Sequence, residues 1–393
     1  MNERRIITLD RNLTGFSSAG KPSSAHHKIM KRLCSPFMGG PKPSDDLMDF
    51  VMHLYNEEEA DLVQHLPVFI PRTAKSIARR SGRSVEDVSR VLDDLALTKR
   101  VLIYFGNPRR YCIVPIVIGL FETVLITPDM SRLNDWHREF AEKFRRLFNT
   151  GFTGNHKWPA VNYLPVNYAT QSMQTTLPYC KLEEFLDPYD DFAVANCQCR
   201  ISTQLQGEGC DKPMEACVFA GKMSRFAMDR GMARKADREE IIEIKHNAER
   251  EGCVSFTIPT IDPLVGNASC SCCSCCCHAF RNITEFSTPA WVCKPLFLPV
   301  YSYDKCTGCQ KCVRICPTQA WSSAGKKQKP EFDDARCIGC GLCVSSCEFE
   351  ALSLTSVREL TDADFSLSKY LLNFIPEYIS GSLSLFSKRL FSR

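Results

Sequence analysis

Residues 305–321 read KCTGCQKCVRICPTQAW, and residues 336–352 read RCIGCGLCVSSCEFEAL. Both stretches have the cysteine spacing C-x2-C-x2-C-x3-C. Each cysteine of the first stretch has a counterpart 31 positions later, and the residues after the last cysteine, PTQA and EFEA, also correspond. The two stretches are therefore an internal duplication.

The spacing predicts two iron–sulfur clusters that exchange their fourth ligands. Three cysteines in a tight loop present thiolates to three irons of a cubane, while the fourth cysteine reaches the other cluster. The expected [4Fe–4S] ligand sets are Cys306, Cys309, Cys312 and Cys347 for one cluster, and Cys337, Cys340, Cys343 and Cys316 for the other. A pair of zinc sites is the alternative, but zinc motifs usually place two C-x2-4-C pairs apart in sequence. The duplicated stretch resembles the bacterial-type two-cluster ferredoxin domain.

Composition limits the remaining interpretation. The chain has 393 residues, of which 44% are hydrophobic, so we expect several globular domains. Its net charge of +4 is too small to indicate a nucleic-acid partner. Of its 23 cysteines, twenty lie between Cys197 and Cys347. No secretory signal is visible at the N-terminus, so we expect a reducing compartment in which thiols serve metals or redox chemistry.

A second group of cysteines precedes the duplication. The sequence NCQCRISTQLQGEGCDKPMEACVFAG, residues 196–221, contains Cys197, Cys199, Cys210 and Cys217 with the spacing C-x-C-x10-C-x6-C. Four thiolates suffice for a cubane or for a tetrahedral zinc ion, and this alternative stays open. Pro213 predicts the first turn of a helix that carries Met214 to Phe219. Arg200 and Lys212 are expected to offset the negative charge of a thiolate-bound cluster.

The third group is the densest. Residues 267–280 read NASCSCCSCCCHAF, and the six cysteines are Cys270, Cys272, Cys273, Cys275, Cys276 and Cys277. Adjacent cysteines rarely form disulfides with each other. They point in different directions on an extended chain, so they could serve two sites at once or leave a thiolate uncoordinated. We expect one or two further iron–sulfur clusters here, and His278 is a ligand, a proton relay or a loop residue.

The words NCQCR, GCDKPMEAC and CSCCSCCC, in this order ahead of a two-cluster domain, resemble a family of iron–sulfur electron-transfer proteins from anaerobic prokaryotes. Members of that family carry a winged-helix-like N-terminal segment that ends in a phrase similar to YCIVPIVIGLFE, residues 111–122. The resemblance implies electron transfer. In the family the multicysteine word has glycines where this chain has Ser274 and His278, so the loop conformation can differ.

The N-terminal sequence predicts a helix-turn-helix followed by a hairpin. Ser44 begins one helical pattern, Thr73 begins a helix that ends by Gly82, and Ser84 caps the next. Residues 101–105 and 110–115 read as strands around a Gly-Asn-Pro turn. Residues 72–110 hold ten Lys or Arg and four Asp or Glu. This patch keeps a DNA-binding redox sensor as an alternative, although acidic residues begin the helix that would meet base edges.

The sequence therefore predicts an α+β, multidomain chain with a winged-helix-like N-terminal domain, a cysteine-rich middle domain and a C-terminal two-cluster ferredoxin-like domain. The expected segments are a flexible tail at 1–43, the winged-helix-like domain at 44–127, a helical connector at 128–180, the cysteine-rich domain at 181–299, the ferredoxin domain at 300–357 and an amphipathic tail at 358–393.

The predicted function is the relay of low-potential electrons to or from a redox partner protein, as a carrier or as a subunit of an oxidoreductase complex. A reductase with a catalytic multicysteine site is the other alternative. We expect a cytoplasmic location. The C-terminal tail could dock on the inner face of the membrane, on a partner or on its own chain, and a nucleic-acid partner is not favoured.

Overall fold

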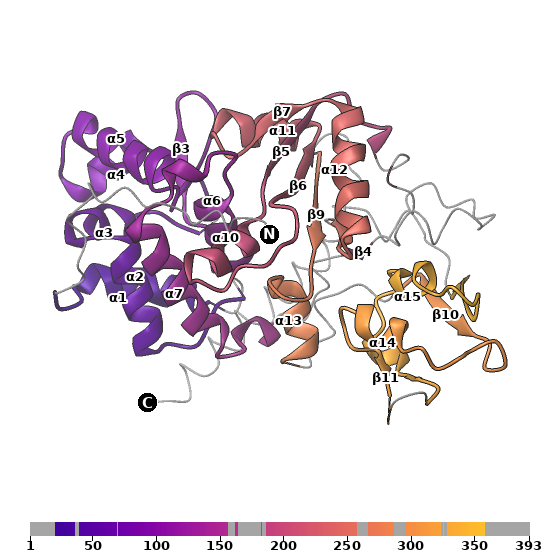
Figure 1. The fold of residues 1–393 in the computed structure, drawn as a ribbon. Coiled ribbons are helices and arrows are strands. Elements are labelled where there is room, and N and C mark those ends of the chain that lie inside the picture. The colour runs from indigo at the N-terminus through magenta and orange to yellow at the C-terminus, as the bar shows by residue number, and fades with distance from the viewer. Residues whose placement is uncertain are drawn as a thin grey trace. The chain divides into compact units, whose positions relative to one another are not determined.

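The computed structural model describes residues 20–35, 39–68, 70–155, 162–163, 182, 186–257, 266–286, 295–323, 325 and 328–357. The predicted amphipathic tail at 358–393 lies outside these ranges. The chain divides into two units, one formed by residues 1–155 and 201–209 and the other by residues 156–200 and 210–393. Helices and strands both contribute to the fold (Figure 1), which confirms the prediction of a mixed α and β chain.

The first unit is mainly helical. Its described α-helices include α1 (Ser24–Leu33), α2 (Asp45–Leu54), α3 (Glu57–Val63), α4 (Ala74–Ser81), α5 (Val85–Asp93), α6 (Phe121–Leu125) and α7 (Asp135–Phe148). A side-chain oxygen accepts a hydrogen bond from the first turn of all of these except α6, and the capping residues are Ser23, Ser44, Asn56, Thr73, Ser84 and Asn134. Such caps satisfy backbone N–H groups that have no partner inside the helix. The predicted helix starts at Ser44, Thr73 and Ser84 are therefore correct.

A small antiparallel sheet completes this unit. The strands β1 (Arg72–Thr73), β2 (Ile103–Phe105) and β3 (Arg110–Cys112) lie in the order β1-β3-β2. The turn between β2 and β3 contains Gly106, whose φ is 72°. A positive φ suits glycine because it has no Cβ. The hairpin predicted from residues 101–115 is therefore present.

Helix α7 packs against α2 in the core of the first unit. The rings of Phe50 and Phe140 lie 5.4 Å apart, and those of His53 and Trp136 are stacked at 4.8 Å. The segment predicted as the start of a connector thus shares a core with the N-terminal helices. The flexible tail predicted at 1–43 is wrong for Ser24–Leu33, because α1 buries Ile29 completely and the His26 ring contacts the carbonyl oxygen of Tyr55 at 2.8 Å.

The second unit contains a six-stranded antiparallel sheet with the order β4-β8-β9-β6-β5-β7. Its strands are β4 (Asn162–Tyr163), β5 (Phe192–Asn196), β6 (Glu215–Ala220), β7 (Arg234–Ala236), β8 (Val254–Thr257) and β9 (Asn267–Cys272). The helix predicted over Met214–Phe219 is wrong, because this segment is β6. Its residues alternate between the two buried faces of a central strand, a period that a helix cannot present.

The second unit also contains helices α11 (Lys222–Asp229), α12 (Arg238–Arg250) and α13 (His278–Thr284), whereas α10 (Gln198–Leu205) begins in this unit and continues into the first. Ile241 of α12 lies in one hydrophobic cluster with Val194 of β5 and Val218 of β6. Residues two apart on a strand share a face, and immediate neighbours do not. The face opposite α12 therefore carries Cys217 of β6 together with Cys270 and Cys272 of β9.

The C-terminal part of the second unit contains two short strand pairs and two short helices. The strands β10 (Phe297–Tyr301) and β13 (Leu352–Ser356) pair antiparallel, as do β11 (Trp321–Ser322) and β12 (Glu331–Phe332). The helices α14 (Lys311–Ile315) and α15 (Leu342–Ser345) begin 31 positions apart, as the sequence repeat requires. No helix among the described residues is long and apolar enough to cross a membrane.

Candidate metal centres

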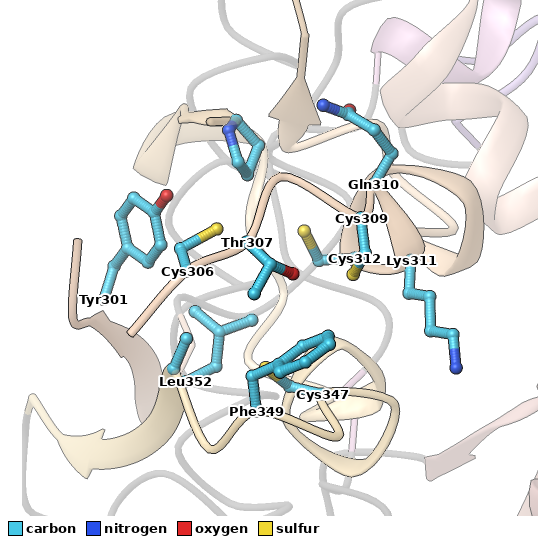
Figure 2. A pocket seen from close by; sticks show the side chains of 12 residues that line it. Tyr301, Cys306, Thr307, Cys309, Gln310, Lys311, Cys312, Cys347, Phe349 and Leu352 are labelled. Atoms are coloured by element: carbon cyan, nitrogen blue, oxygen red, sulfur yellow. The ribbon is translucent and has the colours of Figure 1, made fainter. Parts of the chain in front are cut away.

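The first predicted ferredoxin ligand set surrounds one pocket. Cys306, Cys309 and Cys312 line it together with Cys347, the last cysteine of the second stretch. Figure 2 shows these four side chains around the same space. Cys347 reaches this pocket because β10 precedes the first cysteine stretch, β13 follows the second, and these two strands pair antiparallel. The structure thus provides the exchange of ligands that the spacing predicts.

The second set consists of Cys316, Cys337, Cys340 and Cys343. Burial raises the pKa of Cys337 to about 11 and that of Cys343 to about 12, and the nearby charge of Cys316 raises both further. The pKa of Cys340 is raised for the same reasons. Such thiols are protonated at neutral pH unless a cation holds them as thiolates, and irons of a cluster supply that charge. The donor set therefore fits a thiolate-bound cluster.

Backbone amides point at the sulfur atoms of these loops. The N–H groups of Gly308 and Gly339 donate to the sulfurs of Cys306 and Cys337, with N···S distances of 3.4 Å in both cases. At Gly339 φ is 71°, and an added Cβ would lie 2.5 Å from the carbonyl oxygen of Phe297. Only glycine fits there. Hydrogen bonds to cluster sulfur raise the reduction potential.

Comparison with known proteins agrees with this geometry. Residues 305–351 match the family model of the 4Fe-4S dicluster domain. The chain contains an iron–sulfur domain of the ferredoxin type. No curated protein and no solved structure matches the chain. The predicted iron–sulfur and ferredoxin character is therefore confirmed, whereas the wider resemblance to an electron-transfer family stays a prediction.

The middle cysteines divide differently from the sequence prediction. Cys217 was grouped with Cys210 by spacing, but it lies opposite Cys270 in the β6/β9 register, with 3.8 Å between the sulfurs. Cys210 instead contacts Cys273 and Cys276, at sulfur–sulfur distances of 4.0 and 3.5 Å. Sequence spacing could not give this division, because it depends on which strands are neighbours in the sheet.

The buried group lies on the sheet face opposite α12. Cys197 and Cys199 come from the end of β5 and the start of α10, and Cys272 and Cys277 come from the end of β9 and the start of α13. Hydrogen bonds connect these thiols in the order Cys197, Cys199, Cys277, Cys272. They lower the pKa of Cys197 and Cys277 and raise the pKa of Cys199 and Cys272. The pKa values of adjacent thiols in this chain of contacts are therefore shifted in opposite directions.

His278 follows this group directly. Its Nδ1 lies 3.4 Å from the sulfur of Cys199. Burial lowers the pKa of His278 to about 3, and the charge of Arg281 lowers it further. The imidazole is consequently neutral at physiological pH. Of the three roles that the sequence left open, that of a loop residue is wrong, because His278 is the first residue of α13, and the roles of ligand and proton relay stay predictions.

The second group has its sulfurs closer together. The sulfur atoms of Cys210, Cys273, Cys275 and Cys276 all lie within 4.8 Å of one another. Cys273 and Cys276 are buried, whereas Cys275 is exposed. The hydrogen bond with Cys273 raises the pKa of Cys210, but those from Cys275 and Cys276 outweigh it and lower the pKa to about 6. Hydrogen bonds from the same neighbours lower the pKa of Cys273.

Two buried cations accompany the thiols. Arg200 is 1% exposed and donates to Pro213 O, to Ser271 O at 2.8 Å and to the Cys253 sulfur at 3.2 Å. Lys245 is fully buried, and its Nζ donates to Ser269 Oγ at 2.7 Å and to Cys270 O at 2.8 Å. Buried cations are costly unless negative charge lies nearby. Thiols that ionise on binding a metal would supply that charge, since Cys197, Cys253 and Cys273 lie near Arg200 and Cys217, Cys270 and Cys272 lie near Lys245.

The sequence argument found Arg200 but missed Lys245. The signal was available, since Ile241, Lys245 and Ala248 are spaced by four and three residues and all are buried on one side of α12. A lysine at a core position of an amphipathic helix indicates a buried negative partner. Lys212, expected to offset cluster charge, lies 3.7 Å from Glu251 instead.

Part of the basic patch of the N-terminal unit forms ion pairs with acidic neighbours. Arg83 contacts Glu58 at 2.6 Å and also contacts Asp87, while Arg109 contacts Asp93 at 2.8 Å. Each of these ion pairs reduces the charge that phosphate groups would meet. The contacts give no support to the alternative of a DNA-binding sensor, which stays untested.

Proposed function

We propose that this protein is an electron carrier with three iron–sulfur clusters: two in the C-terminal ferredoxin domain and a third at the buried thiol group on the sheet. The third cluster is assigned to Cys197, Cys199, Cys272 and Cys277. The observation that carries the proposal is the presence of this second thiol centre in the same unit as a dicluster ferredoxin domain. A single dicluster domain needs no such centre.

The surroundings of the buried group support a cluster. Each of its four thiols contacts the next one. Among the described residues, however, no three of these thiols have sulfur atoms that all lie within 4.8 Å of one another. Thiolates of a cubane bind four different irons and are held farther apart than ligands of one ion. Arg200 and Lys245 place positive charge near the site, which stabilises a cluster that gains negative charge on reduction.

The remaining parts fit a carrier that works with a redox partner protein. The ferredoxin domain exposes Cys309 beside its pocket, so one cluster lies near solvent, where electrons can be exchanged. The element order α3, β1, α4, α5, β2 and β3 supports the proposal of a winged-helix-like segment. We assign this winged-helix-like segment to protein docking, since Arg83, Arg90 and Arg109 pair with acidic neighbours and fold alone does not fix function.

The test is quantitation of iron and acid-labile sulfide, with EPR spectra, on the anaerobically purified full chain. We expect about twelve cluster irons, about eight of them from the ferredoxin domain. The double variant Cys199→Ala/Cys277→Ala should lose about four irons and about four sulfides and keep the ferredoxin signals. The matched control is Cys112→Ala, a buried cysteine of the first unit, which should lose none.

An unchanged iron and sulfide content in the double variant would refute the proposal of a third cluster. A carrier also predicts that each cluster is reduced reversibly in an EPR-monitored redox titration without added substrate. Turnover of a small disulfide or organic substrate by the isolated chain with a chemical reductant would instead favour the reductase alternative.

A further inference from the structure

The second thiol group, Cys210, Cys273, Cys275 and Cys276, has a spacing that distinguishes it from the clusters. The sulfur–sulfur distances are 4.0 Å for Cys210 and Cys273, 3.5 Å for Cys210 and Cys276, and 3.9 Å for Cys275 and Cys276. These side chains come from two separated segments, the loop before β6 and the turn between β9 and α13. Four thiols from two segments therefore converge on one point.

These distances match a single tetrahedral ion. Zinc binds thiolate sulfur at about 2.3 Å, and the corners of a tetrahedron of that radius are about 3.8 Å apart. A cubane separates its ligand sulfurs by additional iron–iron and iron–sulfur bonds. The ferredoxin cysteines provide a comparison within the same chain, because Cys306, Cys309, Cys312 and Cys347 surround a pocket but do not form such a group among the described donors.

We infer that Cys210, Cys273, Cys275 and Cys276 bind one thiophilic divalent ion, zinc or a single iron, in a tetrahedral tetrathiolate site. This site is separate from the proposed third cluster and does not depend on electron transfer. Four thiolates and tetrahedral geometry are typical of structural zinc and of mononuclear iron. Because three of the four ligands lie within four consecutive residues, the ion closes the turn after β9 and fixes it to the loop that carries Cys210.

The ion would also stabilise the neighbouring buried thiol group. Cys273 and Cys276 are the immediate neighbours of Cys272 and Cys277, which belong to the buried group. Cys272 and Cys277, at the two ends of the turn, belong to the buried group, and the three cysteines between them belong to the second group, so one turn serves two sites. An ion bound on one side therefore holds the backbone from which the ligands of the other side project.

The experiment compares neighbouring cysteines in the anaerobic full chain. Zinc, iron and acid-labile sulfide are measured for the wild type, for Cys275→Ser, for Cys276→Ser and for Cys277→Ser. We expect Cys275→Ser and Cys276→Ser to lose about one metal ion per chain with no loss of sulfide. Cys277→Ser should lose about four irons and about four sulfides, so it tests the third cluster independently.

X-ray absorption at the edge of the metal that is lost provides the geometric readout. Four sulfur neighbours at about 2.3 Å without a metal neighbour support the site, and the edge distinguishes zinc from iron. Because Cys275 is exposed, its serine variant is the least disruptive to the fold, and its far-UV circular dichroism should match that of the wild type. Loss of four irons and four sulfides from Cys275→Ser, or loss of no metal, would overturn the inference.

Discussion

Replacement of Arg200 by methionine should destabilise the sheet of the second unit more than the loss of any surface arginine. The guanidinium is 1% exposed and donates to two backbone carbonyls, Pro213 O and Ser271 O, and to the Cys253 sulfur. These acceptors lie on three segments, so a single side chain connects the loop before β6, strand β9 and the start of β8. Methionine fills similar volume but donates to none of them.

The magnitude follows from what is left unpaired. Removing one partner of a buried charged contact costs about 3–5 kcal/mol, because the remaining groups stay buried without a hydrogen bond or counter-charge. For a folding unit of this size, about 1 kcal/mol changes the melting temperature by about 2–4 °C, so we expect Arg200→Met to lower it by about 10 °C. Arg200→Lys keeps the charge but has fewer donors, and its melting temperature should lie between the two.

The assay is thermal unfolding of the anaerobic full chain at one fixed scan rate, followed by circular dichroism and by cluster absorbance. The matched control is Arg225→Met, because the Arg225 side chain is 65% exposed and pairs with Asp191. An exposed pair contributes less than about 1 kcal/mol, so this control should change the midpoint by less than about 4 °C. An equal decrease in the two variants would refute the assigned role of Arg200.

Two further predictions concern the other parts of the chain. Gly339→Ala should lower cluster occupancy in the ferredoxin domain, because φ at Gly339 is 71° and an added Cβ would lie 2.5 Å from Phe297 O. The control Gly325→Ala should retain the clusters, because an added Cβ there would have no neighbour closer than 3.6 Å. Equal iron contents in the two variants would contradict this reasoning. In the first unit, burial lowers the pKa of His53 to about 4, so the unfolded state alone binds a proton as pH falls below the ordinary value of 6.5. His53 should therefore lower the free energy of unfolding by about 2 kcal/mol between about pH 7 and about pH 5. Because His137, whose pKa burial lowers to about 3, acts in the same direction, the total decrease should be smaller by about 2 kcal/mol in His53→Gln than in the wild type when urea midpoints are compared.

The sequence was most informative where a short local pattern determines the chemistry. The duplicated C-x2-C-x2-C-x3-C stretches identified the ferredoxin domain, and the pocket lined by Cys306 and Cys347 has the exchanged ligand that the repeat implies. Helix starts at Ser44, Thr73 and Ser84 were also predictable, because a capping side chain acts on amides two or three residues away. Such features need no knowledge of distant contacts.

The division of the middle cysteines could not be predicted in this way. Cys210 and Cys217 are seven residues apart, yet they belong to different groups, because Cys217 lies in a central strand opposite Cys270 and Cys210 lies in the preceding loop. Strand order is decided by packing across the whole sheet, which spacing within one segment does not record. Pro213 favoured a helix locally, but burial of Val218 against α12 selected a strand.

The alternation of residues on β9 explains why serines separate the cysteines there. Ser269 pairs with Val218 and faces α12, where its hydroxyl accepts a hydrogen bond from Lys245, while Cys270 and Cys272 face the opposite side. A shift of the register by one residue would place thiols against the helix and serines at the metal centre. Pairing of β9 with β6 on one side and β8 on the other opposes that shift. The buried lysine therefore specifies the register by requiring a hydroxyl on its own face, and the same requirement directs Cys270 and Cys272 to the opposite face, where the third cluster is proposed.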